Sequence, residues 1–235
     1  ENAVELYDKE LELNERDLKI AEVKNSLGLL SQSDYNALLV ENQKTESSKQ
    51  SLEFALNNAY TSLNQILGED LSTKYEVSLD IEYTPLGETD LEYTILKALS
   101  STQTIKEKEE SAEIARYQLD VYSLEYSGGY KESKQNSYAQ ATRDLEDAKT
   151  QMESDIRSLY NSIQTAETDY TNNLAALEQS KEELEVMSVK LKLGKITQLD
   201  YDKAAYEVEK LENEISQSIY SHYILVSKYN NPDLI

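Results

Sequence analysis

The residues of this chain that could do chemistry are few, and none of them forms a recognisable catalytic set. Its 235 residues include no cysteine, which excludes disulfides, thiolate zinc sites and cysteine nucleophiles. The only histidine, His222, lies between Tyr220 and Tyr223, a setting that favours packing or a surface position over general-base catalysis. The acidic pairs Glu109-Glu110 and Glu182-Glu183 have lysines at helical spacing, which is typical of solvated helix faces.

The sequence also lacks the short motifs that usually mark an enzyme. It has no phosphate-binding glycine loop, no nucleophile elbow and no His/Cys cluster with metal-ligand spacing. We therefore predict that the protein is not an enzyme and has no catalytic residues, no cofactor and no metal site. Its 23 Lys and Arg against 45 Asp and Glu give a formal net charge of −22, which makes nucleic acids and anionic lipid headgroups poor partners.

The most informative pattern is a segment that occurs twice, at positions that differ by 166 residues. Residues 27–35 read LGLLSQSDY, and residues 193–201 read LGKITQLDY. The similarity continues on both sides without a gap, from Leu11 and Leu177 to Lys44 and Lys210. Matching segments at a fixed spacing indicate an internal duplication, so we expect two structural repeats.

Each copy of the segment predicts a tight turn between two helices. Gly28 and Gly194 suit the left-handed position that ends a helix, because glycine has no Cβ. Ser31 and Thr197 suit the N-cap of the following helix. The residues that would complete a capping box and a hydrophobic staple after each N-cap are Asp34, Tyr35, Asp200 and Tyr201.

We expect these two hairpin tips to be a contact surface for a partner protein. Exposed apolar residues at a turn favour binding, and Leu29 and Leu30 are the clearest examples. The predicted contact residues are Leu27, Gly28, Leu29, Leu30, Ser31, Leu193, Gly194, Lys195, Ile196 and Thr197. The alternative is that the segments are only well-formed turns, which explains less readily why Gln32 recurs as Gln198.

Glycine and proline are rare and divide the chain into long helical stretches. We expect helices over 3–27, 32–67, 88–126, 131–193 and 198–229. The fourth stretch would be about 90 Å long at about 1.5 Å per residue. A compact globule of this size has a radius of gyration of only about 17–18 Å. The sequence therefore predicts an elongated all-α protein of antiparallel helical hairpins, unless this stretch is broken where neither Gly nor Pro marks it.

A repeat of seven runs along the fourth stretch. Its apolar positions are Ile156, Ile163, Tyr170, Leu177, Leu184 and Leu191. A companion row, interrupted by Asn173 and Ser180, consists of Leu145, Met152, Leu159, Ala166 and Met187. A sustained heptad pattern favours a coiled coil, and the alternative is one face of an ordinary helical bundle.

One segment breaks the helical period. Over residues 75–83 apolar and polar residues alternate, up to the break at Pro85-Leu86-Gly87, which predicts a short strand or extended crossing. The domain organisation that follows is a first repeat over 1–74 with its tip near 28–31, an extended crossing over 75–87, and a second repeat over 88–235. The second repeat would contain a short turn near 127–130 and a long hairpin with its tip near 194–197.

The order of these features resembles the TolC-type outer-membrane efflux protein family. A long helix, a Gly-x-hydrophobic-Ser/Thr tip, an Asp-Tyr pair and another long helix occur twice in the chain. The second copy is the closer match, from Lys192 to Tyr201, then Ala204-Ala205 and a helix ending in residues 220–223. The first copy continues to Leu67-Gly68, so the resemblance covers most of the chain.

The resemblance implies a fold, partners and a location. Members of this family form homotrimeric hollow helical barrels whose tips dock periplasmic adaptor (membrane fusion) proteins of efflux pumps or type I secretion systems. It also implies an exported protein of the cell envelope or the extracellular space. We expect a signal sequence to precede residue 1, because the helical pattern at Val4 and Tyr7 has no N-cap before it.

The sequence departs from the family pattern where membrane strands are expected. Between Tyr126 and Tyr138 there is only Ser127-Gly128-Gly129-Tyr130 and a short polar run, whereas a transmembrane strand needs about 9–11 alternating residues. No stretch has the roughly 20 apolar residues of a membrane-spanning helix either. We expect a chain without β-barrel strands, either natural in a cell without an outer membrane or shortened by an engineered deletion at Gly128-Gly129.

The predicted function is a helical conduit or scaffold of a transport, efflux or type I secretion assembly, docked to an adaptor through its tips. The alternative is a monomeric extracellular helical spacer, a structural coiled-coil protein with no role in transport.

Overall fold

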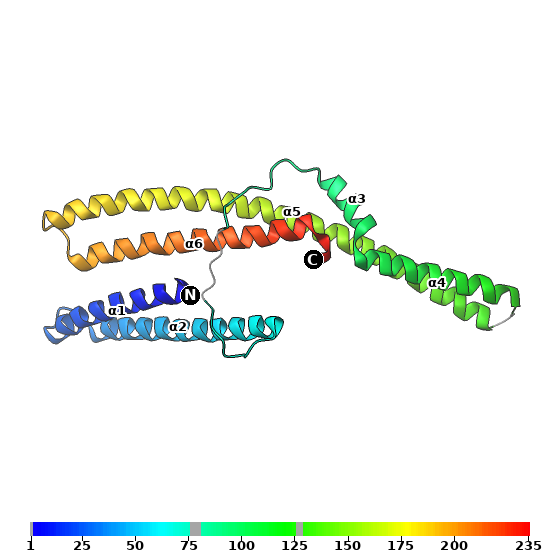
Figure 1. Cartoon of the computed structure of the whole chain (residues 1–235). Coiled ribbons are helices and arrows are strands. Elements are labelled where there is room, and N and C mark those ends of the chain that lie inside the picture. The colour runs from blue at the N-terminus through cyan, green and yellow to red at the C-terminus, as the bar shows by residue number, and fades with distance from the viewer. Residues whose placement is uncertain (1, 76–80, 126–128) are drawn as a thin grey trace. The chain divides into compact units, whose positions relative to one another are not determined.

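The structure is a computed structural model that describes residues 2–75, 81–125 and 129–235. In these ranges it contains α1 (Asn2–Ser26), α2 (Gln32–Leu67), α3 (Leu91–Ser101), α4 (Gln103–Glu125), α5 (Gly129–Lys192), α6 (Gln198–Asn230) and a short 3-10 helix (Pro232–Leu234) (Figure 1). The described residues include no strand, so the predicted all-α class is confirmed.

Four of the five predicted stretches are single helices whose ends lie within two residues of the predicted ones. The remaining stretch, expected over 88–126, begins only at Leu91 and is divided into α3 and α4. The long stretch expected over 131–193 is a single helix of 64 residues, α5, with no break. The break that glycine and proline do not mark therefore falls in the third stretch and not in the fourth.

The break falls at Thr102. Its backbone is extended (ψ 142°), which ends α3, and its buried hydroxyl donates a hydrogen bond to the Ala98 carbonyl oxygen at 2.7 Å. The carboxylate of Asp233 then accepts a hydrogen bond of 2.8 Å from the Gln103 N–H at the start of α4. A helix start needs such an acceptor because its first N–H groups have no partner inside the helix.

Two sequence predictions fall on residues that the structure does not describe. The extended crossing expected over 75–83 includes residues 76–80, which lie outside the described ranges, and residues 81–87 belong to no helix or strand. The turn expected near 127–130 includes residues 126–128, which are also outside them, and α5 begins at Gly129.

The chain divides into two compact units, each made from two stretches of sequence. Unit 1 comprises Glu1–Asp80 and Tyr170–Gln217, and unit 2 comprises Ile81–Asp169 and Ser218–Ile235. These units are defined by packing, whereas the predicted repeats, 1–74 and 88–235, are defined by sequence similarity, so the boundaries of the repeats stay a prediction.

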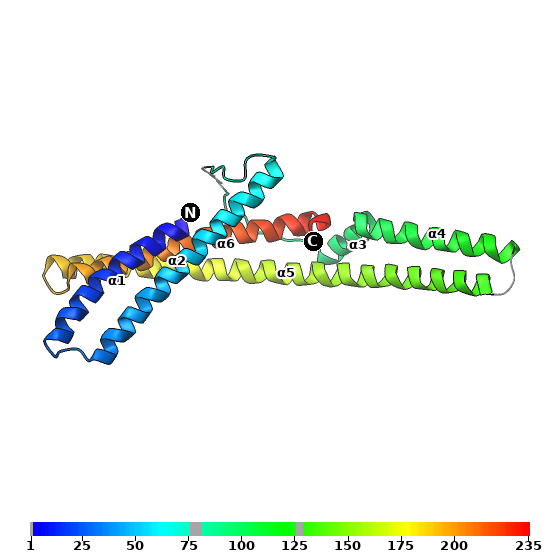
Figure 2. The ribbon, with the colours of Figure 1, turned by 90° about the horizontal axis from the view of Figure 1, so that it is seen from below.

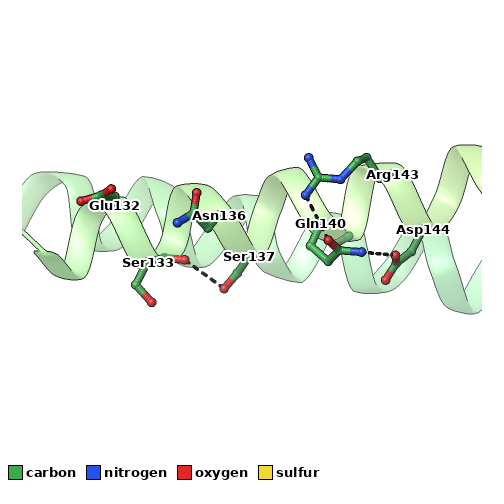
Figure 3. A pocket seen from close by; sticks show the side chains of 8 residues that line it. Glu132, Ser133, Asn136, Ser137, Gln140, Arg143 and Asp144 are labelled. Carbon is green, nitrogen blue, oxygen red and sulfur yellow. Dashed lines mark hydrogen bonds between the residues drawn. The ribbon is translucent and has the colours of Figure 1, made fainter.

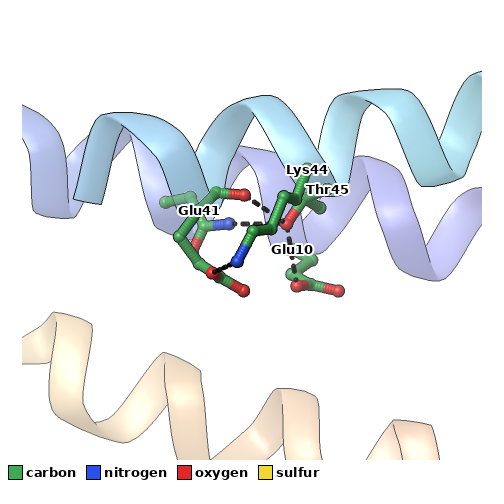
Figure 4. Close-up of polar contacts among 5 residues, drawn as sticks. Glu10, Glu41, Lys44 and Thr45 are labelled. Atoms are coloured by element: carbon green, nitrogen blue, oxygen red, sulfur yellow. Dashed lines mark hydrogen bonds and ion pairs between the residues drawn. The ribbon is translucent and has the colours of Figure 1, made fainter. Parts of the chain in front are cut away.

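Unit 1 contains two antiparallel helix pairs. One pair is α1 and α2, and the other is the C-terminal part of α5 with the N-terminal part of α6 (Figures 1 and 2). Polar side chains join α1 to α2, since Lys49 lies 2.6 Å from Asp8 and the Thr45 hydroxyl donates to Glu10 at 3.2 Å. Figure 4 shows this contact, with Glu10 beneath Glu41, Lys44 and Thr45.

Unit 2 has the more apolar interior. Its buried cluster is drawn from four helices and consists of Ile95, Ala98, Ile105, Met152, Ile156, Ile163 and Tyr229. The Tyr229 hydroxyl donates to Thr94 Oγ1 at 3.2 Å, so the ring is buried while its polar end is paired. His222 is also buried, with its Nε2 3.2 Å from Glu167 and its ring 5.0 Å from that of Tyr83.

The heptad pattern of α5 corresponds to its covered face. Ile156 and Ile163 are fully buried, and the later positions of the row, from Tyr170 to Leu191, are half-buried. The companion row is covered as well, including Asn173 and Ser180, which interrupt its apolar pattern. A coiled coil and a bundle face both predict this burial.

We predict that Ile163→Ala destabilises the protein by about 3 kcal/mol, because it deletes a fully buried side chain and leaves a cavity. Val189→Ala, a matched control on the exposed side of the same helix, should cost less than about 0.5 kcal/mol. Urea unfolding followed by circular dichroism measures both values. Equal costs for the two variants would contradict the assignment of the buried face.

Candidate functional site

The first predicted tip ends α1 with a left-handed glycine. Gly28 has φ of +70°, and its N–H donates to the Asn25 carbonyl oxygen at 3.0 Å. The N–H of Leu29 donates to the Lys24 carbonyl oxygen at 2.8 Å. This pair of bonds is the Schellman motif, which satisfies carbonyl groups that the end of a helix leaves unpaired.

The second tip has the same geometry at the end of α5. Gly194 has φ of +65°, its N–H donates to the Leu191 carbonyl oxygen at 2.9 Å, and the Lys195 N–H donates to the Lys190 carbonyl oxygen at 2.9 Å. Apart from the glycine itself and its two chain neighbours, no atom lies within 4 Å of where a Cβ would stand on either residue. Glycine is therefore favoured at these positions by the backbone conformation and not by lack of space.

The helix that follows each turn begins with the expected cap. The Ser31 hydroxyl accepts a hydrogen bond from the Asp34 N–H at 3.0 Å, and the Thr197 hydroxyl accepts one from the Asp200 N–H at 3.2 Å. In the second tip the carboxylate of Asp200 also accepts from the Thr197 N–H at 2.9 Å, which completes a reciprocal capping box.

These bonds change the ionisation of Asp200. The backbone N–H of Thr197, and after it the Thr197 hydroxyl, lowers the pKa of the Asp200 carboxyl below its ordinary value, because both donate to the ionised form. Lys203 adds a smaller effect of the same sign. The negative carboxylate is also placed at the positive end of the α6 dipole.

The exposure of the tip residues divides them into two groups. Leu27, Leu29 and Leu193 are 67%, 74% and 64% exposed. The smaller or polar tip residues are exposed as well, namely Gly28, Ser31, Asp34, Gly194, Lys195, Thr197 and Asp200. The half-buried ones are Leu30, Tyr35, Ile196 and Tyr201, the residues at the hydrophobic-staple positions.

The expectation that Leu30 is exposed is therefore wrong, and that of Leu29 is confirmed. Leu30 lies immediately before the N-cap, and the Asn25 side-chain amide donates to its carbonyl oxygen at 3.1 Å, which holds this residue against the turn. Leu29 follows the left-handed glycine and is directed into solvent.

Both tips lie at the same end of unit 1 (Figures 1 and 2). Polar contacts between α1 and α6 include Lys9–Glu209 at 2.5 Å, Arg16–Asp202 at 2.8 Å, Asp17–Lys203, and a 2.8 Å hydrogen bond from the Tyr206 hydroxyl to Glu10. Residue numbers rise along α1 as they fall along α6, so the two helices are antiparallel. Because α1 leads into the first tip and α6 leads out of the second, this pairing brings the tips together.

The sequence does not indicate these contacts between the repeats. They join residues nearly 200 positions apart, and the duplication suggests two similar hairpins without indicating which of their faces meet. Tyr206 is one of the residues in these contacts. Its burial, and after it the hydrogen bond to Glu10, raises the pKa of its hydroxyl.

A polar hollow in unit 2 offers no comparable site. It lies along the N-terminal part of α5 between Glu132 and Asp144 (Figure 3). There the side chain of Gln140 donates to Asp144 at 2.6 Å and accepts from Arg143 at 3.0 Å. Gln140, Arg143 and Asp144 thus hydrogen-bond to one another on the surface of one helix, and they do not converge on a common position for a ligand.

The described residues contain no group of three or more His, Cys, Asp or Glu side chains arranged to hold a metal ion. None of the helices in the described ranges combines the length and the apolar character that crossing a membrane requires.

We predict that Thr197→Ala raises the pKa of Asp200 toward its ordinary value, because the hydroxyl donor is lost. The depressed pKa means that the ionised carboxylate stabilises the fold above the unfolded-state pKa. This contribution is lost as the pH falls through the folded-state pKa. An NMR titration of the Asp200 carboxyl carbon measures the midpoint. Ser31→Ala, in the other tip, is the matched control, and an unchanged midpoint in Thr197→Ala would contradict the assigned cause.

Comparison of the sequence with protein-family models finds no match, and comparison with curated proteins finds none either. The resemblance to the TolC-type family therefore rests on the tip residues and their duplication.

Proposed function

We propose that the chain is a TolC-like component of a transport, efflux or type I secretion assembly, and that it docks an adaptor protein through its two hairpin tips. One observation carries the proposal. The same glycine-ended turn is built twice, at the same end of unit 1, and each copy exposes a leucine just before its glycine.

The exposed leucines support a role in binding. Scattered apolar residues are normal on a protein surface, but Leu27, Leu29 and Leu193 are gathered at two turns of one unit. Burial of a leucine side chain yields about 1.5–3 kcal/mol relative to full exposure. A partner that covers the tips would therefore gain binding energy without any change in the helices behind them.

The identity of the partner follows from the family resemblance. It would be a periplasmic-adaptor-like (membrane fusion) protein, and the chain itself would be exported and act as a helical conduit or scaffold. The resemblance also implies a homotrimer. The rival function, a monomeric extracellular helical spacer, requires neither a partner at the tips nor self-association.

Solution mass distinguishes these two functions. We predict a homotrimer of about 80 kDa, three times the chain mass of 26.8 kDa, in sedimentation equilibrium over a range of concentrations. A chain that stays at 26.8 kDa up to high concentration would support the spacer.

Photo-crosslinking in the native cell tests docking at the tips. We predict that a photoreactive amino acid at Leu29 or Leu193 captures one protein, and that mass spectrometry identifies it as an adaptor with a helical hairpin. The matched control is Phe54 on α2, which is 60% exposed, close to the 64% of Leu193, but lies outside the tips. Capture of the same protein from Phe54, or of no adaptor from either tip, would contradict the proposal.

A further inference from the structure

A cleft in unit 1 lies between three helices. Its lining residues fall within 3–10 on α1, 41–52 on α2 and 206–217 on α6, so the tip residues take no part in it. Its volume is about 620 Å³. Small-molecule sites in proteins usually have volumes of about 300–1,000 Å³, so this cleft is large enough for a ligand.

The carboxylate of Glu10 joins the three helices that form the cleft. Glu10 itself is on α1, its Oε1 accepts a hydrogen bond of 3.2 Å from the Thr45 hydroxyl on α2, and its Oε2 accepts one of 2.8 Å from the Tyr206 hydroxyl on α6 (Figure 4 shows the contact with Thr45). Both donors are neutral hydroxyl groups. They fix the position of the carboxylate without compensating its negative charge.

Other carboxylates at the same helix contacts have a cation beside them. Asp8 lies 2.6 Å from Lys49, and Asp202 lies 2.8 Å from Arg16. For Glu10, by contrast, the described residues provide no Lys, Arg or His nitrogen within 4.0 Å of the carboxylate. A half-buried negative charge without a counter-ion is unfavourable, and a cationic ligand would relieve it.

The two lysines of the cleft leave this charge in place. Lys44 is paired with Glu41 at 3.2 Å (Figure 4), and Lys210 is exposed. The lining contains three carboxylates, those of Glu10, Glu41 and Glu214, against these two lysines. The cleft therefore has a formal charge of 2 − 3 = −1, which favours a cation over an anion.

Aromatic and aliphatic side chains surround the carboxylate. Tyr7, one turn before Glu10 on the same face of α1, lines the cleft together with Tyr206, and both are half-buried. The half-buried Leu6 and Leu52 line it as well. The faces of aromatic rings attract ammonium groups electrostatically, so tyrosine rings beside an uncompensated carboxylate suit an organic cation.

We propose that this cleft binds a small organic cation, an amine or a quaternary ammonium with an apolar body. Its charge would lie beside Glu10 and its body against Tyr7 and Tyr206. A metal ion fits less well, because Mg²⁺ and Ca²⁺ need several oxygen ligands and the described residues contain no group of three or more acidic or histidine side chains arranged for one. The inference goes beyond the proposed function, since it requires neither an adaptor nor the tips.

Calorimetric titration of the full chain tests the preference for a cation. Benzyltrimethylammonium should bind with a stoichiometry of one per chain, whereas benzyl alcohol and phenylacetate, which carry the ring without the positive charge, should not bind detectably. The titrations are made at physiological salt, where charges act over only about 8 Å, so that the net charge of −22 does not by itself concentrate cations on the protein.

Substitutions then locate the binding. Glu10→Gln, which keeps the shape of the side chain, should weaken benzyltrimethylammonium at least about tenfold. Glu12→Gln removes the same charge from an exposed position of α1 outside the cleft, and this matched control should leave the affinity unchanged. Lys210→Gln removes a competing positive charge, so it should strengthen the binding.

A second variant covers the case in which Glu10→Gln disturbs the packing of the three helices. Tyr7→Leu leaves Glu10 and its two hydrogen bonds in place and replaces the ring by an aliphatic side chain. It should weaken benzyltrimethylammonium at least about threefold, because the attraction between the ring and the cation is lost. Circular dichroism with thermal unfolding shows which of the variants keep the fold.

Three results would overturn the proposal. The first is the absence of benzyltrimethylammonium binding, or equal binding of phenylacetate. The second is an affinity that changes as much in Glu12→Gln as in Glu10→Gln, or that does not change in a folded Tyr7→Leu. The third is displacement of the organic cation by magnesium chloride more strongly than by sodium chloride of the same ionic strength, which would assign the cleft to a metal ion.

Discussion

The first two helices of this protein have few residues to bury, and this limit affects how they associate. In α1 only Leu13 and Ala21 are buried, and in α2 only Thr45 and Asn64. With so few buried residues, α1 contacts α2 partly through polar side chains, as between Lys49 and Asp8. Its contact with α6 is therefore made by long side chains, as in the Arg16–Asp202 ion pair. Exposed ion pairs contribute only about 0–1 kcal/mol each, so these contacts set the register of the two hairpins more than their stability.

The same limit explains which parts of the fold the sequence could predict. A glycine at the end of a periodic stretch is a local signal, and it predicted the C-terminal ends of α1 and α5 to within one residue. The repeat of seven is also local, and it predicted the covered face of α5. At the break near Thr102, the Gln103 N–H donates to Asp233, which lies 130 residues farther along the chain. No local pattern predicts that contact. The antiparallel pairing of α1 with α6 is hidden for the same reason.

The candidate site shows a similar division between local and non-local information. The turn type and both caps could be predicted, because glycine conformation and capping depend on adjacent residues. Exposure could not, since Leu29 and Leu30 are the same residue type side by side and differ only in which way the turn directs them. The repeat pairs Val23 with Val189, but only the structure shows that these side chains are 57% and 54% exposed.

The net charge acquires a clearer role once its distribution is known. At physiological ionic strength, charges act over about 8 Å, so a partner responds to the side chains near its contact and hardly to the total of −22. The three exposed lysines of the second tip, Lys190, Lys192 and Lys195, therefore affect a molecule at that tip more than the acidic side chains farther along the helices do.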